Sequence, residues 1–198
     1  ANDPESSHDL GRNIVNKMMK GGKVMACPFI DENKKAFKYW RDVGTLEAYW
    51  EANMDLVAVD PLFNLYDTDW PIYMKPMQAP PPKFVFSQEG PGGRMGVALD
   101  SLICNGSVIS GGRVRNSVVG PNVRVNSYAE VRESILFDNV EVGRHARIQR
   151  AIIDKGVIVP EGLSIGYDIE EDRKKFFVSP CGIVVIPKGG VIPSGTVI

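Results

Sequence analysis

From about residue 99 the chain repeats every 17 residues, and this repeat restricts the fold more than any other feature of the sequence. Aliphatic residues return after six, six and five positions. They form three columns: Leu102, Val119, Leu136 and Ile153; Val108, Val125, Val142 and Val159; and Val114, Val131, Ile148 and Ile165. One inward branched residue on each of three short faces per turn predicts a triangular coil of parallel β-strands.

Two further columns describe the corners of this coil. Asn and Gly adopt the left-handed backbone conformation at least cost, and they recur at Asn105, Asn122, Asn139 and Gly156. Small residues follow in step at Ser117, Ser134 and Ala151. An α/β protein with short buried strands is the alternative. It predicts no fixed period, and residues 99–166 show no amphipathic helical pattern, so a parallel β-helix is favoured.

The residues before the repeat form a shorter, mixed region. Residues 8–20 and 45–58 have helical spacing of apolar residues, with Gly21-Gly22 as a stop for the first helix and Thr45 as N-cap of the second. Residues 23–29 are expected to form a strand. Some sixty residues are too few for a complete α/β domain with a parallel sheet.

We therefore expect three regions. Residues 1–59 are the remnant of a larger α/β domain, and 60–98 are an ordered linker rich in proline and aromatic residues. Residues 99–198 are the β-helix, and residues 169–176 are expected to form a short helical cap that covers its unpaired strand edges.

Composition excludes several classes of partner. The formal net charge of -1 gives no basic field to attract nucleic acid or anionic lipid, and no apolar run has the length of a membrane span. The three cysteines, Cys27, Cys104 and Cys181, lie far apart without metal-ligand spacing, which favours a reducing compartment such as the cytoplasm.

Several motifs resemble one enzyme family. The run Tyr39-Trp40-Arg41-Asp42-Val43-Gly44-Thr45, the upstream Ser6-Ser7-His8-Asp9-Leu10-Gly11 and the linker motif Trp70-Pro71-Ile72 are similar to segments of bacterial ADP-glucose pyrophosphorylases (glucose-1-phosphate adenylyltransferases). The resemblance covers nearly the whole chain and places it in the C-terminal part of that family. The six-residue spacing resembles the hexapeptide repeat of left-handed β-helices.

This resemblance implies a mainly β fold: a left-handed parallel β-helix preceded by the C-terminal fragment of a Rossmann-like nucleotidyltransferase domain. It implies an enzyme of glycogen biosynthesis that makes ADP-glucose and pyrophosphate from ATP and glucose 1-phosphate with Mg²⁺, in a homotetramer regulated by a small-metabolite effector. Asp42 then resembles the metal-binding, catalytic aspartate, Asp9 and Trp40 the glucose 1-phosphate pocket, and Lys155 a basic residue that binds effector phosphate.

Each of these residues also has a plainer interpretation. Asp42 would cap a helix or pair with Arg41, Trp40 would be a core residue, and Lys155 would be a solvated corner residue. Leu10 stands where the family usually has Phe, which changes one wall of the expected sugar pocket.

The chain lacks the family's glycine-rich nucleotide loop, its F-V-E-K-P segment and its first metal aspartate. We therefore expect the isolated chain to have no adenylyltransferase activity. The first alternative is a non-catalytic β-helix module for oligomerisation or effector binding. The second is a hexapeptide acyltransferase with His145 as its catalytic histidine, although the nearly uninterrupted coil offers no protruding loop for an acyl-CoA groove.

Overall fold

The computed structural model describes residues 4, 6–31, 36–73, 77–190 and 192. It divides the chain into two compact units, Ala1–Trp40 and Arg41–Ile198. Each unit is described by itself. The boundary between them falls before residue 59, so the second helical segment belongs to the same unit as the β-helix.

The N-terminal unit is built from short elements. A π-helical turn, η1 (Leu10–Val15), continues into α1 (Asn16–Gly21), which ends at Gly22 as the sequence predicts. The two-residue strands β1 (Ile30–Asp31) and β2 (Ala36–Phe37) pair antiparallel. The strand expected at residues 23–29 is absent from this described stretch, and that prediction was wrong. No residue of η1 or α1 is buried, so neither helix forms a core within the unit.

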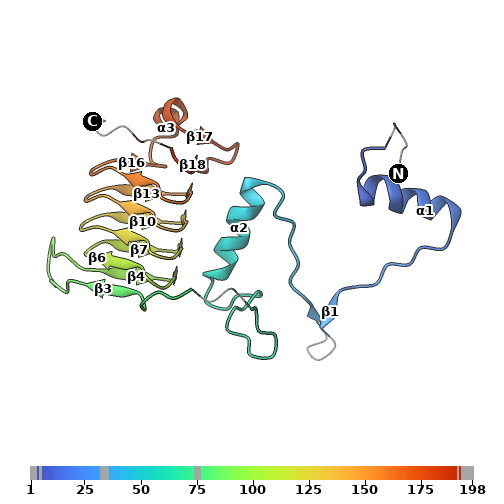
Figure 1. Cartoon of the computed structure of the whole chain (residues 1–198), viewed down its shortest axis with the longest axis horizontal. Coiled ribbons are helices and arrows are strands. Elements are labelled where there is room, and N and C mark those ends of the chain that lie inside the picture. The colour runs from blue at the N-terminus through green and yellow to red at the C-terminus, as the bar shows by residue number, and fades with distance from the viewer. Residues whose placement is uncertain (1–3, 5, 32–35, 74–76, 191, 193–198) are drawn as a thin grey trace. The chain divides into compact units, whose positions relative to one another are not determined.

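The second unit begins with a loop and then α2 (Leu46–Leu56). The hydroxyl of Thr45 accepts a hydrogen bond from the backbone N–H of Ala48 at 3.1 Å, which confirms the predicted N-cap. Figure 1 shows the loop, α2 and the stacked coils that follow.

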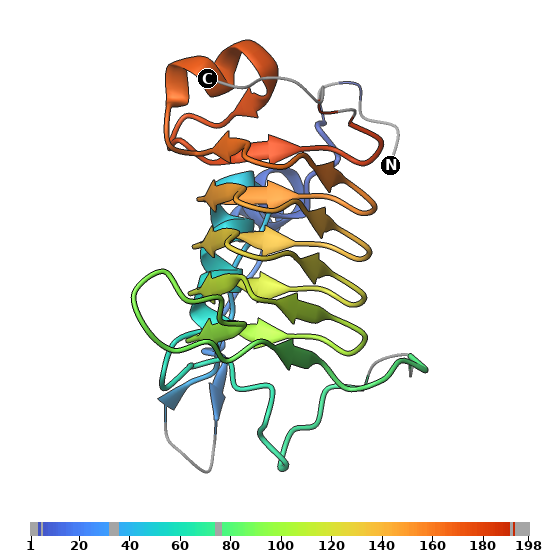
Figure 2. The same cartoon turned by 90° about the vertical axis from the view of Figure 1, so that its left-hand side faces the viewer.

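The rest of this unit is a parallel β-helix, and Figure 2 shows its coils stacked one above another. One sheet has the order β15-β12-β9-β6-β3 and another the order β16-β13-β10-β7-β4. The third sheet has the order β17-β18-β14-β11-β8-β5, and α2 packs against side chains on the outer face of this sheet. The strands are β3 (Lys83–Val85), β4 (Val97–Leu99), β5 (Leu102–Ile103), β6 (Val108–Ser110), β7 (Arg113–Arg115), β8 (Val118–Val119), β9 (Arg124–Val125), β10 (Glu130–Arg132), β11 (Ile135–Leu136), β12 (Glu141–Val142), β13 (Arg147–Gln149), β14 (Ala151–Ile153), β15 (Ile158–Val159), β16 (Ser164–Ile165), β17 (Phe177–Val178) and β18 (Val184–Ile186).

The predicted fold is thus confirmed, with one local error in register. Inward-facing positions from Val114 onward are fully buried, as the columns predict. In the first coil, however, Ile109 pairs with Val125 and Ile103 with Val119, so these residues replace Val108 and Leu102 in the core. The first coil is one residue shorter because it turns tightly through Gly112. A Cβ there would lie 2.7 Å from a methyl group of Val125.

The corner column has the same one-residue shift. Asn122, Asn139 and Gly156 have positive φ, as predicted, but in the first coil the residue with positive φ is Gly106 rather than Asn105. The coil also begins earlier than residue 99, because β3 already pairs in parallel with β6.

The C-terminal cap is confirmed. Helix α3 (Ile169–Lys175) has Asp168 as its N-cap, and β17 then pairs antiparallel with β18. Asp172 is buried in this cap, and its carboxylate accepts a hydrogen bond from the backbone N–H of Gly166 at 2.7 Å. Across the residues that the structure describes, no helix is long and apolar enough to cross a membrane.

Candidate functional site

The loop before α2 carries Asp42, the candidate metal ligand. One carboxylate oxygen, Oδ1, accepts a hydrogen bond from the backbone N–H of Gly44 at 3.0 Å, and the side chain is exposed. This contact closes a tight turn immediately before the Thr45 cap. Asp42 is therefore held by its own turn, with the carboxylate accessible to a ligand.

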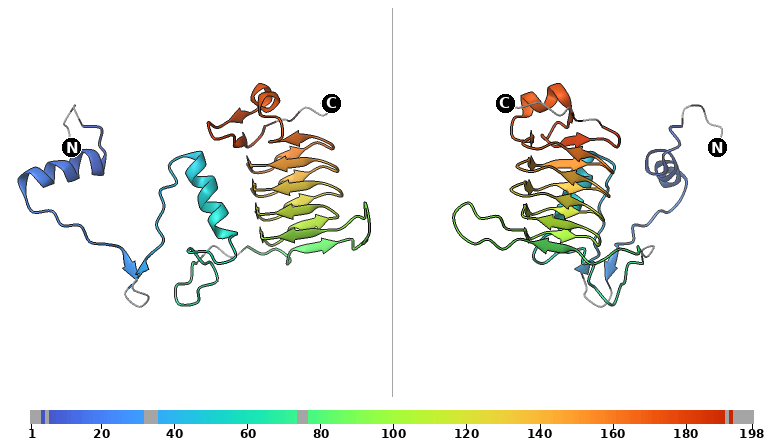
Figure 3. Two further views of the ribbon diagram at one scale, coloured as in Figure 1. Left: turned by 180° about the vertical axis from the view of Figure 1, so that it is seen from behind. Right: turned by 60° about the vertical axis from the view of Figure 1, so that its left-hand side comes forward.

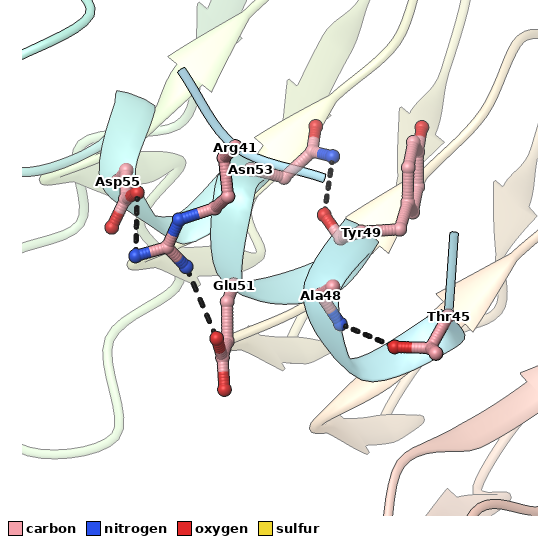
Figure 4. A network of polar contacts seen from close by, with 7 residues as sticks. All are labelled: Arg41, Thr45, Ala48, Tyr49, Glu51, Asn53 and Asp55. Carbon is pink, nitrogen blue, oxygen red and sulfur yellow. Dashed lines mark hydrogen bonds and ion pairs between the residues drawn. The ribbon is translucent and has the colours of Figure 1, made fainter. Parts of the chain in front are cut away.

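Arg41 is bound to α2 rather than to Asp42. Its guanidinium lies 3.0 Å from Glu51 Oε2 and 3.3 Å from Asp55 Oδ2, as Figure 4 shows. These two acceptors stand one helical turn apart, at the spacing that places side chains on one helix face. The ion pairs therefore tie the chain just before Asp42 to the helix that follows it.

Asp9 and Trp40, the candidate sugar-pocket residues, both lie in the N-terminal unit. Asp9 is the N-cap of η1, and its Oδ1 accepts from the backbone N–H of Arg12 at 2.7 Å. The side chain of Trp40 is 77% exposed, so it is not the core residue that the plainer interpretation suggests. Asp42 and Lys155 belong to the other unit.

Lys155, the candidate effector residue, lies at a corner of the β-helix. Its Nζ is 3.5 Å from Asp138 Oδ2, one coil earlier, and about half of the side chain is exposed. Asp154 shapes the corner by accepting from the backbone N–H of Lys155 at 2.7 Å and from that of Lys188 at 3.2 Å. Burial, and secondly the charge of Asp138, raises the pKa of the nearby Cys104 thiol. An incoming anion would have to compete with Asp138 for the ammonium group.

His145 occupies another corner. It is exposed, has a positive φ of 57°, and stacks on Tyr128 of the previous coil with ring centroids 4.9 Å apart. Tyr128 also has a positive φ, and both residues stand in the same corner column as Gly111 and Gly162. A corner-stacking role accounts for this histidine without acyl transfer.

No cluster of three or more His, Cys, Asp or Glu suited to a metal ion occurs in the described ranges of the chain. Asp42 therefore belongs to no such cluster within these ranges. That fits Mg²⁺, which proteins bind through one or two carboxylates together with waters and substrate phosphates. Waters and substrate phosphates would supply the remaining ligands.

Two functional candidates were missed from the sequence, Trp50 and Arg150. The guanidinium of Arg150 lies over the Trp50 ring, 5.2 Å from its centroid, and Trp50 Nε1 donates to the backbone oxygen of Glu133 at 2.8 Å. The sequence shows the helical spacing that places Trp50 on one face of α2. It does not show that a corner of the β-helix is the partner of Trp50.

Comparisons with known proteins match both parts of the chain. Residues 80–186 match the family described as "GlmU-like, C-terminal hexapeptide", and residues 1–58 match that described as "Nucleotidyl transferase". The hexapeptide match supports the left-handed sense of the coil. The expected boundary at residue 59 stays a prediction, although the second match ends close to it.

Individual relatives extend over nearly the whole chain. A glucose-1-phosphate adenylyltransferase of Rhodopirellula baltica is 57% identical over 195 residues, which are 98% of this chain and 44% of the relative. One from Koribacter versatilis is 56% identical over 95% of this chain and 44% of its own length. One from Methylococcus capsulatus is 46% identical over 94% of this chain and 43% of its own length. The chain thus spans less than half the length of these relatives, and the resemblance seen in the sequence motifs is confirmed.

Proposed function

The chain belongs to the GlmU-like C-terminal hexapeptide family, and from this premise we propose that it is the C-terminal part of an enzyme that makes ADP-glucose and pyrophosphate from ATP and glucose 1-phosphate. The observation that carries the proposal is 57% identity to a glucose-1-phosphate adenylyltransferase over 98% of the chain, on both sides of α2. Similarity that extends through the Asp42 loop favours this enzyme over a β-helix module alone.

Asp42 supplies one ligand to Mg²⁺ in this proposal. Its exposed carboxylate, fixed by the Gly44 N–H, can bind the cation without rebuilding the loop. Mg²⁺ held by Asp42 would supply positive charge that offsets the negative charge of the phosphates when the glucose 1-phosphate oxygen attacks the α-phosphorus of ATP and pyrophosphate leaves. The role of this chain is to hold the carboxylate in place.

Asp9 and Trp40 are proposed to line the glucose 1-phosphate pocket. A carboxylate accepts hydrogen bonds from sugar hydroxyl groups, and an indole face packs against the apolar faces of a sugar ring. Only one carboxylate oxygen of Asp9 is used by the Arg12 N–H, and Trp40 is largely exposed. Both groups are therefore available to a ligand.

Lys155 is proposed to bind a phosphate group of the small-metabolite effector. The Lys155–Asp138 ion pair is exposed enough to be weak, so a phosphate could displace it. In the whole protein, Lys155→Ala should change the effector concentration that gives half-maximal response and leave unstimulated activity intact. Identical effector titrations of variant and parent would remove this assignment.

The family relationship further supports a homotetramer, allosteric control and a cytoplasmic location as parts of the proposal. The three cysteines are free in the structure, which agrees with a reducing compartment. The tetramer is tested by the mass of the whole protein in solution.

The decisive experiment is an ADP-glucose synthesis assay on the whole native protein that contains this sequence. We expect Mg²⁺-dependent synthesis that Asp42→Asn lowers strongly, and no synthesis by the 198-residue chain alone. If the native protein has a mass of 21.8 kDa and makes no ADP-glucose, the proposal is overturned and the non-catalytic module is favoured. Acyl transfer from an acyl-CoA that depends on His145 would favour the acyltransferase.

A further inference from the structure

Helix α2 is fastened to the β-helix by a polar clamp made of Trp50 and Arg150. Trp50 Nε1 donates to the backbone oxygen of Glu133 at 2.8 Å, and the Arg150 guanidinium lies over the same indole ring. Arg150 Nη2 also donates to the backbone oxygen of Cys181 at 3.3 Å. Trp50 thus joins the helix to two successive corners of the coil, and Arg150 joins the second of these corners to Cys181.

The coil corner behind this clamp has little freedom to move. Glu133 and Arg150 stand 17 positions apart in equivalent corners, and both have positive φ, 46° and 48°. The backbone N–H of each donates to the coil below, Glu133 to Arg115 and Arg150 to Arg132. Non-glycine residues keep such a conformation only where their surroundings fix it. The clamp therefore has a rigid base.

Apolar contacts support the clamp along the helix. Tyr49 stacks on Phe137, with ring centroids 6.3 Å apart and planes 9° apart. Trp50 and Met54 pack against the buried side chains of Ile135, Ile152 and Ile183. These three isoleucines lie outside the coil interior and would face water without α2, whose position alongside the coils is visible in Figure 3.

Another face of α2 holds the chain before it. Arg41 is paired with Glu51 and Asp55 of the helix, and the turn of Asp42 leads directly into the Thr45 cap. A shift or rotation of α2 on the coil would therefore move Asp42 with it. Asp42 and the clamp lie in the same compact unit.

We propose that Trp50 and Arg150 are positioning residues for Asp42, through which the β-helix sets the place of the metal-binding carboxylate. This inference rests on the proposed function, in which Asp42 binds Mg²⁺. Neither residue contacts the reacting groups. They fix the helix, the helix fixes the turn, and the turn fixes the carboxylate, and a displacement of about 1 Å at such a group is enough to slow catalysis strongly.

The test uses the whole enzyme with Trp50→Phe and Arg150→Met. Phenylalanine keeps an aromatic ring against the isoleucines but cannot donate to Glu133, and methionine keeps much of the arginine's length without its charge. Each should raise, roughly tenfold, both the Mg²⁺ concentration for half-maximal activity and the Mg²⁺ dissociation constant measured by calorimetric titration of the enzyme with Mg²⁺ alone. Arg150→Lys should recover part of this loss because it keeps a cation near the indole.

Arg132→Met is the matched control. Arg132 stands one coil earlier on the neighbouring sheet and is paired only with Glu130, at 3.1 Å, among the ion pairs of the described chain. It should retain the parent's Mg²⁺ dependence. An unchanged Mg²⁺ dependence in Trp50→Phe and Arg150→Met, or the same increase in Arg132→Met, overturns the inference.

A double-mutant cycle separates positioning from general stability. If Trp50 acts through Asp42, Trp50→Phe should have little further effect on kcat/KM once Asp42 is already Asn. If the double variant loses kcat/KM by the product of the two single losses, Trp50 acts independently of Asp42, and the inference is overturned. A parent enzyme that makes no ADP-glucose at all would instead refute the proposed function, so the two failures are distinguishable.

Discussion

The backbone N–H of Ser134 donates to the hydroxyl of Ser117 at 3.1 Å, across one coil of the β-helix. The backbone N–H of Ser117 likewise donates to the hydroxyl of Ser101, and the backbone N–H of Ala151 donates to the hydroxyl of Ser134, each at 3.1 Å. Each hydroxyl also donates to the carbonyl two residues earlier. These serines thus complete the backbone hydrogen bonding at one corner.

Removing the buried hydroxyl of Ser134 should destabilise the coil. Ser134→Ala leaves the Ala151 N–H without its acceptor in a fully buried position, at a cost of about 1–3 kcal/mol. The small size of alanine is tolerated there, since Ala151 already occupies the next level. Urea unfolding measures the loss.

Ser101→Ala is the control for this prediction. Ser101 makes equivalent bonds but is only half-buried, so water can replace its hydroxyl. Ser101→Ala should lower the free energy of unfolding clearly less than Ser134→Ala does. Equal losses in the two variants would show that burial does not determine the value of this serine column.

Replacing Ile109 by Asp tests the corrected register of the first coil. Ile109 is fully buried and pairs with Val125, while the adjacent Val108 is only half-buried. An unpaired carboxylate in the coil interior is strongly unfavourable, so Ile109→Asp should prevent folding of the first coil. Val108→Asp should be tolerated. Circular dichroism measures the folding of both variants. If Val108→Asp unfolds the coil and Ile109→Asp does not, the register expected from the sequence is the correct one.

The sequence predicted the β-helix well because each coil repeats the same physical requirement. Branched residues at Val125, Val142 and Val159 must each fill the same interior position, so the pattern is averaged over several coils. The first coil of the repeat follows only β3 and β4, and the long segment between these two strands departs from the 17-residue spacing. There, adjacent aliphatic pairs such as Val108-Ile109 fit either register, and the short corner at Gly112 settles the choice.

The candidate site was less predictable. The Thr45 cap and the helix between 45 and 58 followed from local signals, because capping depends on neighbours in sequence, whereas Asp42 was identified by resemblance. The contact of Trp50 with Glu133 joins residues 83 positions apart, and no local pattern encodes it. Asp9 and Trp40 were identified by resemblance alone, and their shared role in a sugar pocket stays a prediction.

Adding a side chain at Gly166 should unfold the C-terminal cap. Gly166 has φ +81°, and a Cβ there would lie 1.8 Å from the backbone oxygen of Gln149. Backbone must move to relieve that overlap, so Gly166→Ala should cost about 3 kcal/mol or more. Thermal unfolding is the measurement.

Gly162→Ala separates this overlap from backbone strain. Gly162 has a similar φ of +73°, but no atom lies within 4 Å of its Cβ position. Gly162→Ala should therefore lower the free energy of unfolding only by the strain of an alanine in the left-handed conformation, about 1–2 kcal/mol. Equal melting temperatures for the two variants would mean that the contact with Gln149 does not govern the cap.

Asp172 gives the cap a specific dependence on pH. Burial, and secondarily the charge of Asp168, raises the pKa of this carboxyl above its ordinary value of 3.8, against the opposing effects of the Gly166 N–H and Lys175. Because the folded state favours the protonated form, the contribution of Asp172 to stability is largest at pH below 3.8. It falls as pH rises towards the folded pKa.

Asp172→Asn removes this titration while keeping an oxygen that can accept from the Gly166 N–H. The free energy of unfolding of the parent, minus that of Asp172→Asn, should therefore decrease between pH 4 and neutrality and then level off. Asp172→Ala removes the acceptor as well, so it should be less stable than Asp172→Asn at every pH. Urea unfolding of the three proteins across this range measures both differences. A parent that instead gains stability over Asp172→Asn as pH rises would show that the ionised carboxylate stabilises the cap, because its hydrogen bond with Gly166 would then outweigh the cost of burying its charge.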